Sequence, residues 1–495
     1  MPTAVLPATR PWPLHDTVAS RALEASAAAA LPSHALMARA GRGVARLALA
    51  LAPRARRVLA LAGPGNNGGD ALVAAVHLHD AGLAVSVALL ADPDRLPADA
   101  AWALAQARTR PDLDIRQGMP NAWHADLVMD GLLGLGLSRA PAGPVADAIA
   151  AVNHAGVPVL SIDLPSGLDG DRGTAFDLAA IRATHTLALL SLKPGLFTAE
   201  GRDHAGQVWF DDLGVPPSNT PLRLAGPPDA ANAPHASHKG QFGDLVVIGG
   251  DVGMGGAAVL AAHAGLAAGA GRVYLGSLGR DAFAASRPEL MQRQVPALLA
   301  PPDLQARTVV AGCGGGEAVR AVLPPLLHHA GRLVLDADAL NTVADDASLQ
   351  VAVITRSAAG RPTLMTPHPL EAARLLGTST AAVQADRVSA ARAMAARFNA
   401  VVVLKGSGSA VAAPDGSVTI CPFGNARLST AGTGDVLAGW LGGLWSRTAS
   451  AAGGTAALAE IACTGVARHG LAAELAPGQG PLLAADLIRA MQRAT

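Results

Sequence analysis

The sequence contains few cysteines and no excess of either charge. Its three cysteines, Cys313, Cys421 and Cys463, lie far apart and form no CxxC or Cys/His metal spacing. This pattern argues against a disulfide framework and a zinc site, and it fits a reducing cytoplasm. Lysine plus arginine and aspartate plus glutamate balance at 38 each, so no net field attracts the chain to nucleic acid or to an anionic membrane. Any anionic ligand must therefore be held by local geometry.

Long apolar segments are also absent. The Ala/Gly-rich stretch 255–271 includes His263 and is shorter than the ~18–20 strongly apolar residues that a membrane-spanning helix needs. Residues 1–13 are rich in proline and lack the apolar centre of a signal peptide. We therefore expect a soluble cytoplasmic protein with no membrane or nucleic-acid partner, and we expect it to form a homo-oligomer.

Lysine is rare as well. It occurs only at Lys193, Lys239 and Lys405, and each of these precedes Gly or Pro-Gly. Biased codon usage explains this pattern as well as a local need for a compact ammonium group does. Composition alone leaves both explanations open.

The order of strand-like and helix-like segments predicts two α/β domains. A chain of 495 residues is too long for one ordinary core and corresponds to ~2–4 domains. Alternating apolar strands and helices predict a mainly parallel, doubly wound sheet covered on both faces. The alternation stops at 215–237, which is rich in Pro, Asn and Ala, and we place the linker there. The expected domains are 1–220 and 221–495.

Individual elements follow from periodicity and turn residues. In the first half we expect strands at 57–62, 83–89, 127–130, 157–163, 186–190 and 207–210, and helices at 18–30, 33–51, 70–80, 94–109 and 146–155. In the second half we expect strands at 245–248, 272–275, 308–311, 333–336 and 400–404, a hairpin of 409–413 with 417–421, and helices at 255–268, 434–445, 455–469 and 483–493. Ser33 is the expected N-cap of the second helix.

The first strong motif is Gly-Pro-Gly-Asn-Asn-Gly-Gly-Asp at 63–70, between a strand and a helix. Glycines allow the backbone to approach a ligand closely, and free amides at a helix start bind phosphate. Gly and Asn are common in ordinary turns, but eight such residues in succession indicate a ligand loop. The motif is not the dinucleotide fingerprint G-x-G-x-x-G, so we expect another nucleotide-phosphate loop.

Two later strands of the first half end on aspartates, Asp130 and Asp163, each followed by a glycine-containing loop. Carboxyl ends of adjacent parallel strands share one crevice, so we expect Asn66, Asn67, both aspartates and Ser166 to converge. Helix capping or a turn explains either aspartate alone, whereas their joint placement favours a site. Oxygen ligands without thiol or imidazole suit a hard cation rather than zinc, and the sparse carboxylates leave a monovalent ion open.

The sharpest motif of the second half is Ala-Gly-Thr-Gly-Asp-Val-Leu-Ala-Gly at 431–439. Successive amides at 432–435 open a helix whose dipole favours anions. Asp435 can take a proton from an attacking hydroxyl while these amides hold the transferred phosphoryl charge. A capped, glycine-rich helix start is the plain structural alternative. The long apolar helix that follows favours phosphoryl chemistry.

Three further segments agree with such chemistry. Lys405 opens the loop Lys-Gly-Ser-Gly-Ser, whose amides and ammonium could bind nucleotide phosphates. Asp336 and Asp338 gather at the end of one strand, although helix capping explains them equally well. His368 lies between two prolines before a helix, and both a structural role and a ligand role stay open for it.

Together these motifs resemble a known pair of families. The stretches GPGNNGGD, VMDGLLGLGLSR and SIDLPSGLDG, with LMARAG and KPG, resemble the NAD(P)H-hydrate epimerase domain over 14–215. The stretches HKGQFG, MGGA, GCGGG, LDADALN, TPHPLE, LKGSGS and AGTGDVLAG resemble the ADP-dependent NAD(P)H-hydrate dehydratase family over 236–492. The resemblance implies a Rossmann-like first domain and a ribokinase-like second domain.

The epimerase resemblance implies a potassium ion bound by Asn67, Asp130 and Ser166, with Asp163 as the catalytic acid/base. It implies that the hydrated nucleotide contacts Asn66, Asn67, Gly68, Gly69, Asp70, Gly134, Leu135, Gly136, Leu137, Ser138, Arg139, Ala140 and Asp163. Leu135 stands where the family often has a small polar residue.

The dehydratase resemblance implies that ADP or AMP contacts Lys405, Gly406, Ser407, Gly408, Ser409 and Gly434. It implies that the hydrated nucleotide contacts Ala257, Gly314, His368 and the catalytic Asp435. Cys313 stands where the family usually has proline, and we expect a looser loop there that still binds.

The implied reaction is the repair of NADHX and NADPHX, the hydrates of NADH and NADPH. The co-substrate ADP phosphorylates the ring hydroxyl of the S hydrate, yielding AMP, and phosphate then leaves; Mg²⁺ would neutralise the phosphates. The first domain would interconvert the R and S epimers, so one chain would be an isomerase and a lyase. An alternative is a small-molecule kinase fused to a non-catalytic nucleotide-binding scaffold. The LDADALN segment and the His368 loop speak mildly against the kinase, and Asn67, Asp130 and Asp163 against the scaffold.

Overall fold

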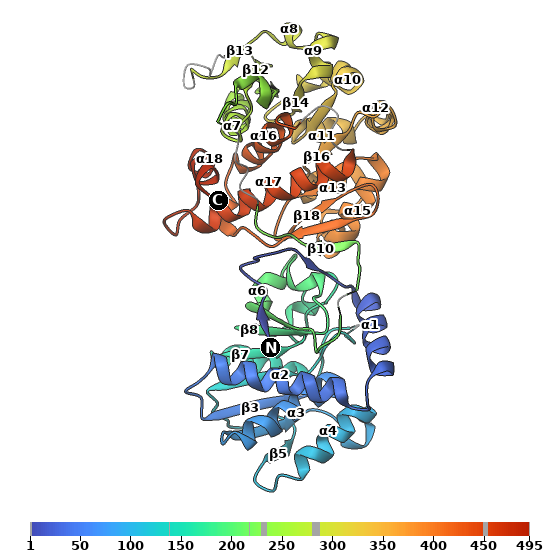
Figure 1. Cartoon of the computed structure of the whole chain (residues 1–495), viewed down its shortest axis with the longest axis vertical. Coiled ribbons are helices and arrows are strands. Elements are labelled where there is room, and N and C mark those ends of the chain that lie inside the picture. Colours follow the sequence, from blue (N-terminus) through green and yellow to red (C-terminus); the bar gives the residue numbers. More distant parts are fainter. Residues whose placement is uncertain are drawn as a thin grey trace. The chain divides into compact units, whose positions relative to one another are not determined.

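The protein consists of two compact units, Met1–Leu224 and Ala225–Thr495 (Figure 1). The structure, a computed structural model, describes residues 2–137, 139–216, 218–228, 235–279, 288–448 and 454–494. Each unit contains its own mainly parallel sheet with helices packed on it. This architecture confirms the predicted α/β class with two domains.

The sheet of the first unit has the order β1-β9-β8-β7-β6-β3-β4-β5. Its strands are β1 (Thr3–Ala4), β3 (Arg57–Ala62), β4 (Ala84–Leu89), β5 (Asp114–Gln117), β6 (Leu127–Gly131), β7 (Val159–Ile162), β8 (His185–Leu189) and β9 (Gln207–Asp211). All neighbours are parallel except β1 and β9. The chain adds β4 on one side of β3 and β6 on the other, so the order reverses between β3 and β6. Ligands of doubly wound sheets bind at the carboxyl ends of the strands at such a reversal.

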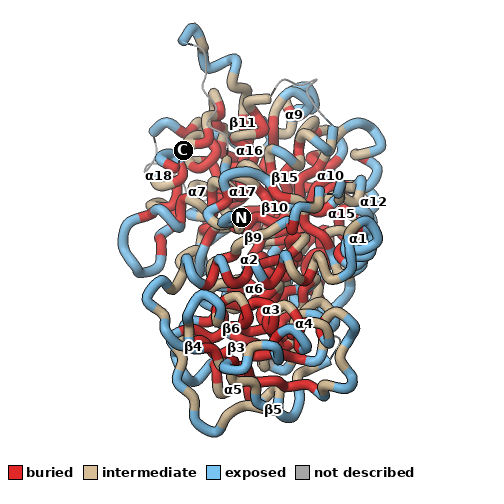
Figure 2. The backbone as a smooth tube through the Cα atoms, turned by 60° about the horizontal axis from the view of Figure 1, so that its bottom comes forward, coloured by how far each residue is buried: buried red, intermediate tan, exposed pale blue. Residues whose placement is uncertain are grey.

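Helices cover both faces of this sheet. They are α1 (Thr17–Ala30), α2 (Ala35–Leu51), α3 (Asn66–Asp80), α4 (Ala98–Arg108), α5 (Pro144–Ala155) and α6 (Gly201–Ala205). Strand β3 shows the two faces clearly, because alternate side chains of a strand point in opposite directions. Val58 and Ala60 pack with α2, α3 and α4, whereas Leu59 and Leu61 pack with α5. Figure 2 shows the central strands as buried.

The sheet of the second unit has the order β13-β12-β11-β14-β15-β16-β17-β18-β19. Its strands are β11 (Asp244–Gly249), β12 (Arg272–Ser277), β13 (Met291–Gln292), β14 (Thr308–Ala311), β15 (Arg332–Leu335), β16 (Thr363–Met365), β17 (Val401–Leu404), β18 (Ser409–Ala412) and β19 (Val418–Cys421). Strands from β13 to β17 are parallel, and β17, β18 and β19 pair antiparallel. The order reverses between β11 and β14, which again predicts a ligand crevice at the carboxyl ends.

The helices of the second unit are α7 (Gly255–Ala267), α8 (Val295–Leu298), α9 (Pro301–Ala306), α10 (Val319–His329), α11 (Asp338–Ala344), α12 (Ala347–Ala358), α13 (Pro369–Leu376), α14 (Thr380–Ala385), α15 (Arg387–Phe398), α16 (Thr433–Ser446), α17 (Thr455–Leu475) and α18 (Ala484–Arg493). Apolar side chains of α7, α16 and α17 form one core with the sheet, including Leu245, Val310 and Val403. Helix α10 contacts β14, α12 contacts β16, and α15 contacts β17 and β18.

Several sequence predictions of detail were wrong. The second helix is capped by His34 in the left-handed region rather than by Ser33. Helix α3 begins at Asn66, not at Asp70, so the glycines after it belong to the first helical turn. In contrast, the boundary between the two units, Leu224–Ala225, lies within the predicted linker 215–237. This stretch also contains a strand that was not predicted, β10 (Leu222–Leu224), which pairs with β2 (Trp12–Pro13); residues 217 and 229–234 lie outside the described part of the chain.

Helix α10 was not predicted, because it contains Pro324 and Pro325, and proline normally interrupts a helix interior. Among the described residues, no helix is both long and apolar enough to cross a membrane.

Candidate active sites

The loop between β3 and α3 is packed against the loop after β6. A Cβ at Gly63 would lie 1.7 Å from the carbonyl oxygen of Leu132, and one at Gly68 would lie 2.1 Å from the carbonyl oxygen of Gly63. Only glycine fits at these two positions, whereas a Cβ at Gly65 would meet nothing within 4 Å. The glycines therefore bring the start of α3 against the neighbouring strand end at the reversal point of the sheet.

Asn67, Asp130 and Ser166 come together around this contact, as predicted. The fully buried Asp130 accepts hydrogen bonds from the Ser166 hydroxyl (2.5 Å), the Ser166 amide (2.9 Å) and the Ser161 hydroxyl (2.8 Å). The Asn67 amide group donates to the carbonyl oxygen of Leu133 (2.9 Å), which also accepts from Ser166 (3.2 Å). Among the described residues, the hydrogen-bond donors to Asp130 are neutral, and burial raises the pKa of Asp130 despite these hydrogen bonds.

Asp163 follows β7 and forms a buried ion pair. Its backbone has φ +67°, a left-handed conformation that aspartate tolerates better than most residues. Oδ1 accepts hydrogen bonds from the Lys193 ammonium and from the amide of Leu189 (3.1 Å). Lys193 is 1% exposed and also donates to the carbonyl oxygens of Leu189 and Ser191, both at 2.9 Å. One carboxylate oxygen is thus held in place, while Asp163 still lines the cavity described next.

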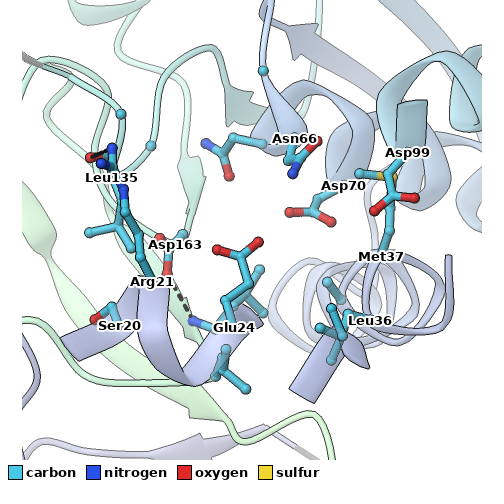
Figure 3. Close-up of a pocket in the computed structure, with 18 of the residues that line it drawn as sticks. Ser20, Arg21, Glu24, Leu36, Met37, Asn66, Asp70, Asp99, Leu135 and Asp163 are labelled. Carbon is cyan, nitrogen blue, oxygen red and sulfur yellow. Dashed lines mark hydrogen bonds between the residues drawn. The ribbon is translucent and has the colours of Figure 1, made fainter. Parts of the chain in front are cut away.

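A cavity of about 920 Å³ lies over these loops and is drawn in Figure 3. Asn66, Asn67, Asp70 and Asp163 of the predicted substrate residues line it, together with the predicted residues Gly134, Leu135, Gly136, Leu137 and Arg139. Gly68 and Gly69 are buried, and a Cβ at Gly69 would press on Met37, so both face the protein rather than the cavity. Ala140 does not line the cavity, and Ser138 lies outside the described residues.

Acidic side chains of two further helices also line this cavity, and they were not predicted from the sequence. Glu24 on α1 and Asp99 on α4 join Asp70 on α3. Burial raises the pKa of Asp70 well above its usual value, and the carboxylates of Asp163, Glu24 and Asp99 add to this effect. Burial, with Asp163 nearby, also raises the pKa of Glu24.

In the second unit, Asp336 links the ends of several strands. It follows β15, is 1% exposed, and accepts hydrogen bonds from the Lys405 ammonium and the Thr366 hydroxyl, both at 2.7 Å. The Cys313 thiol lies 3.9 Å from its other oxygen. Burial alone would lower the pKa of Lys405, but the Asp336 and Glu371 carboxylates outweigh it and the pKa is raised. Asp336 therefore positions Lys405 and does not cap a helix.

Asp435 lies beside this ion pair. Ligand atoms of Cys313, Asp336 and Asp435 are all within 4.8 Å of one another. Burial, followed by the negative charge of Asp336, raises the pKa of Asp435 to about 6. Gly432 caps α16 with φ +89°, and a Cβ at Gly434 would be 3.4 Å from the Lys405 ammonium nitrogen. The carboxylate, the ammonium and the first turn of α16 thus form one cluster.

The loop of Lys405, Gly406, Ser407, Gly408 and Ser409 joins β17 to β18. Gly406 has φ +139°, and its amide donates to the Ser409 hydroxyl (3.2 Å), which in turn donates to the Gly406 carbonyl oxygen (3.0 Å). The buried guanidinium of Arg387 donates to the carbonyl oxygens of Leu404 and Lys405. Arg387 was not predicted, because nothing in its local sequence distinguishes it from the many other arginines.

His368 caps α13. Its Nδ1 accepts hydrogen bonds from the amides of Leu370 (3.1 Å) and Glu371 (3.3 Å), while Nε2 lies 3.2 Å from a Glu371 carboxylate oxygen. Because Nδ1 accepts, the ring proton is on Nε2 and faces Glu371. Burial raises the pKa of Glu371 to about 7. The histidine thus has the structural role that the sequence left open, and its half-exposed ring leaves a ligand contact as a prediction.

The glycine loop after β14 is held by backbone hydrogen bonds, and its greater looseness stays a prediction. The carbonyl oxygens of Cys313 and Gly314 accept hydrogen bonds from the amides of Gly250 (3.0 Å) and Asp251 (2.7 Å). Gly314 has φ +56°, and a Cβ there would lie 2.9 Å from the Ala257 methyl group. The predicted residues Ala257 and Gly314 therefore lie in contact at the reversal point of the second sheet.

Comparison with known proteins finds a family match in each unit. A family described as YjeF-related protein N-terminus matches residues 33–195, and the NAD(P)H-hydrate dehydratase family matches residues 245–493. The bifunctional NAD(P)H-hydrate repair enzyme Nnr of Coxiella burnetii is 36% identical over 481 residues, which cover 92% of this chain and 94% of that protein. The Escherichia coli protein of the same name is 34% identical over 501 residues, 95% of this chain and 91% of that protein.

A solved structure that resembles this chain is the ADP/ATP-dependent NAD(P)H-hydrate dehydratase from Bacillus subtilis, co-crystallized with ATP/Mg²⁺. The two sequences are 28% identical, the TM-score is 0.44, and the match covers 54% of this chain and 92% of that chain. The sequence identity of 34–36% to these repair enzymes extends over nearly the whole chain and confirms the resemblance predicted from the motifs. The chain belongs to the family of bifunctional NAD(P)H-hydrate repair enzymes.

Proposed function

We propose that this protein repairs NADHX and NADPHX by epimerising the R and S hydrates in its first unit and dehydrating the S hydrate with ADP in its second. The observation that carries the proposal is the match of one chain, over nearly its full length, to bifunctional repair enzymes. The two side-chain clusters support it, because each sets a carboxylate beside a glycine-rich helix start.

In the first unit, Asp163 would act as acid/base on the hydrate, with Lys193 holding one of its oxygens. The start of α3 and the loop 134–139 would hold the phosphorylated part of the substrate. The groups around Asp130 are suitable ligands for a potassium ion, because a carboxylate, an amide, a hydroxyl and a carbonyl group each offer an oxygen atom. The buried Asp130 carboxylate accepts hydrogen bonds from neutral groups among the described residues, so a bound monovalent cation would stabilise its negative charge. Asn67, Asp130 and Ser166 would hold this ion, which would fix the two loops together.

In the second unit, ionised Asp435 would take the proton from the C6 hydroxyl as the oxygen attacks the terminal phosphorus of ADP. The P–O bond to AMP breaks, and the amides at the start of α16 and the Lys405 ammonium stabilise the charge on the transferred group. The lone pair of the ring nitrogen then expels phosphate from C6, and loss of a proton from C5 restores the double bond. ADP or AMP would contact the loop 405–409 and Gly434.

Mg²⁺ fits this unit as an ion carried mainly by the nucleotide phosphates. Among the described residues, Cys313, Asp336 and Asp435 form a group with metal-ligand spacing. A thiol is a poor ligand for Mg²⁺, and Asp336 is already paired with Lys405.

We also propose that the protein acts in a reducing cytoplasm, where its three free cysteines would stay reduced.

The decisive experiment incubates the protein with a mixture of hydrate epimers and ADP and follows the absorbance of the restored dihydronicotinamide ring. We expect recovery of both epimers with one AMP formed per ring. The variant Asp163→Asn should recover only the S fraction, and Asp435→Asn should recover none. Mixing the two variants should restore full recovery, because Asp163→Asn retains an active second unit and Asp435→Asn retains an active first unit. Formation of a stable phosphorylated product, as expected of a small-molecule kinase, or the absence of AMP would contradict the dehydratase proposal. Full recovery by Asp163→Asn would contradict the role of that residue.

A further inference from the structure

Four carboxyl groups line the cavity of the first unit: those of Glu24, Asp70, Asp99 and Asp163. Figure 3 shows Glu24 and Asp70 directed into the same space, which Asn66 and Asp163 also border. The four belong to different elements, namely α1, α3, α4 and the end of β7. The cavity therefore presents negative charge from several sides.

Besides Arg139, which also lines the cavity, three cationic groups lie near these carboxyls, and each has a partner. Lys193 is bound to Asp163, and His34 is 2.6 Å from Asp99. Arg21 lies near Glu24 and reaches the carbonyl oxygen of Leu135 at 3.5 Å. In the described part of the chain no ion pair to Asp70 is found.

Asp70 and Asp163 consequently differ in their surroundings. Asp163 is paired with the buried ammonium of Lys193, whereas no such partner of Asp70 is found among the described residues. Burial and three neighbouring carboxylates raise the pKa of Asp70 well above its usual value, so it favours the neutral acid. Two carboxyl groups in one site whose environments separate their protonation states form an acid/base pair.

The chemistry of the hydrate matches such a pair. Its C6 carries a hydroxyl next to the ring nitrogen, so protonation of the hydroxyl lets water leave while the nitrogen lone pair forms an N1=C6 double bond. The resulting cation is planar at C6, and addition of water to the other face gives the other epimer. Surrounding carboxylates stabilise this cation, whereas they would not stabilise the neutral aldehyde of a ring-opening route.

We propose that Asp70 is the general acid that protonates the departing C6 hydroxyl, and that Asp163 removes a proton from the water that adds to the opposite face. The inference rests on the epimerase activity proposed above. In one direction Asp70 loses a proton, the C6–O bond breaks and water departs; a new C6–O bond then forms as Asp163 gains a proton. Exchange with solvent returns both groups to their starting states, and the reverse reaction uses them in exchanged roles.

The test is epimerisation in water labelled with the heavy oxygen isotope, without ADP. The wild-type protein should place one labelled oxygen at C6 for each epimerisation, above the spontaneous rate. Epimerisation without label would show ring opening and overturn the inference while leaving the proposed epimerase function intact. If the wild-type protein does not epimerise the hydrates at all, the proposed function fails and this inference with it.

The variant Asp70→Asn should lose ~10²–10⁴-fold in both epimerisation and label exchange, and Asp70→Glu, which keeps an acid, should retain more activity. The matched control is Asp80→Asn at the other end of α3, where the carboxylate is exposed and pairs with Arg110; it should retain wild-type rates. Asp70→Asn with wild-type activity would overturn the inference.

The pH profile of the unmutated protein gives a test that does not depend on folding of a variant. Because Asp70 must carry its proton to act, kcat/KM for epimerisation should fall as the pH rises through its raised pKa. The groups that face Asp70 are Glu24, Asp99 and Asp163, with Arg21, His34 and Lys193 next to them. A rate that rises steadily with pH instead would overturn the assignment of Asp70 as the acid.

Discussion

Replacing Asp336 by asparagine should move the acid limb of the dehydratase pH profile to lower pH. Asp435 is the proposed base and could accept a proton only when ionised, so dehydration should be half-maximal near its pKa of about 6 and lost below it. After burial, the charge of Asp336 is the largest factor that raises this pKa. The variant Asp336→Asn removes that charge and leaves the Lys405 ammonium, 2.7 Å away, without its partner. Both changes favour ionised Asp435.

The distance between the two carboxylates sets the size of the shift. Their ligand oxygens lie within 4.8 Å. At this separation, the repulsion between two unit negative charges is about 3.5 kcal/mol with an effective dielectric constant of about 20, and about 0.9 kcal/mol in water. At about 1.36 kcal/mol per pKa unit, these limits correspond to shifts of about 2.5 and about 0.6 units. The partial exposure of Asp435 places the expected shift between them.

The assay is the initial rate of ADP-dependent ring recovery from the S hydrate, measured from about pH 4 to 8 and expressed as kcat/KM. The midpoint is the readout, because loss of the Lys405 contact will also reduce the rate at every pH. The control Asp303→Asn removes a half-exposed surface carboxylate that pairs with Arg307 and should leave the midpoint near that of the wild-type protein. A midpoint of Asp336→Asn that is unchanged or higher would refute the role of Asp435 as the titrating base.

Three further predictions concern the first unit. The variant Gly63→Ala, whose methyl group would meet a carbonyl oxygen at 1.7 Å, should lower the thermal stability of this unit, whereas Gly65→Ala, with open space at its Cβ, should not; equal melting temperatures would contradict the packing. The variant Lys193→Met should destabilise the unit by ~3–5 kcal/mol by leaving a buried carboxylate unpaired, and adding Asp163→Asn should recover part of this loss, as measured by hydrogen exchange of α3 and β7 in the full chain. The variant Ser166→Ala should raise the potassium concentration for half-maximal epimerisation by roughly 10–100-fold; an unchanged potassium dependence would count against the proposed ion site.

Much of the fold followed from local patterns in the sequence. Most strands of both sheet centres were predicted within a few residues, because buried parallel strands are short apolar runs between glycine-rich turns. The central strand β16 was missed, since it has only three residues. Elements with mixed composition were missed. The edge strand β5 contains Asp114 and Arg116 with only one apolar residue, and α10 contains two prolines. Their stability comes from neighbours in the fold, which periodicity does not record.

The candidate sites divide in the same way. Motif residues such as Asn67, Asp130 and Asp435 were identified because glycines and a carboxylate follow a strand in one short segment. Glu24 and Asp99 were missed, because each lies on a separate amphipathic helix and resembles any solvated acid.

Local sequence was sufficient to identify the two glycine-rich helix starts and the aspartates beside them, since a glycine turn and the helix start that follows it are encoded by adjacent residues. The protonation states of these aspartates were not accessible in that way. Lys193 pairs with Asp163 from 30 residues away and Lys405 with Asp336 from 69 residues away, while Asp70 is left among other acids. Burial and opposite charge set a pKa, and both depend on which distant segments the folded chain brings together.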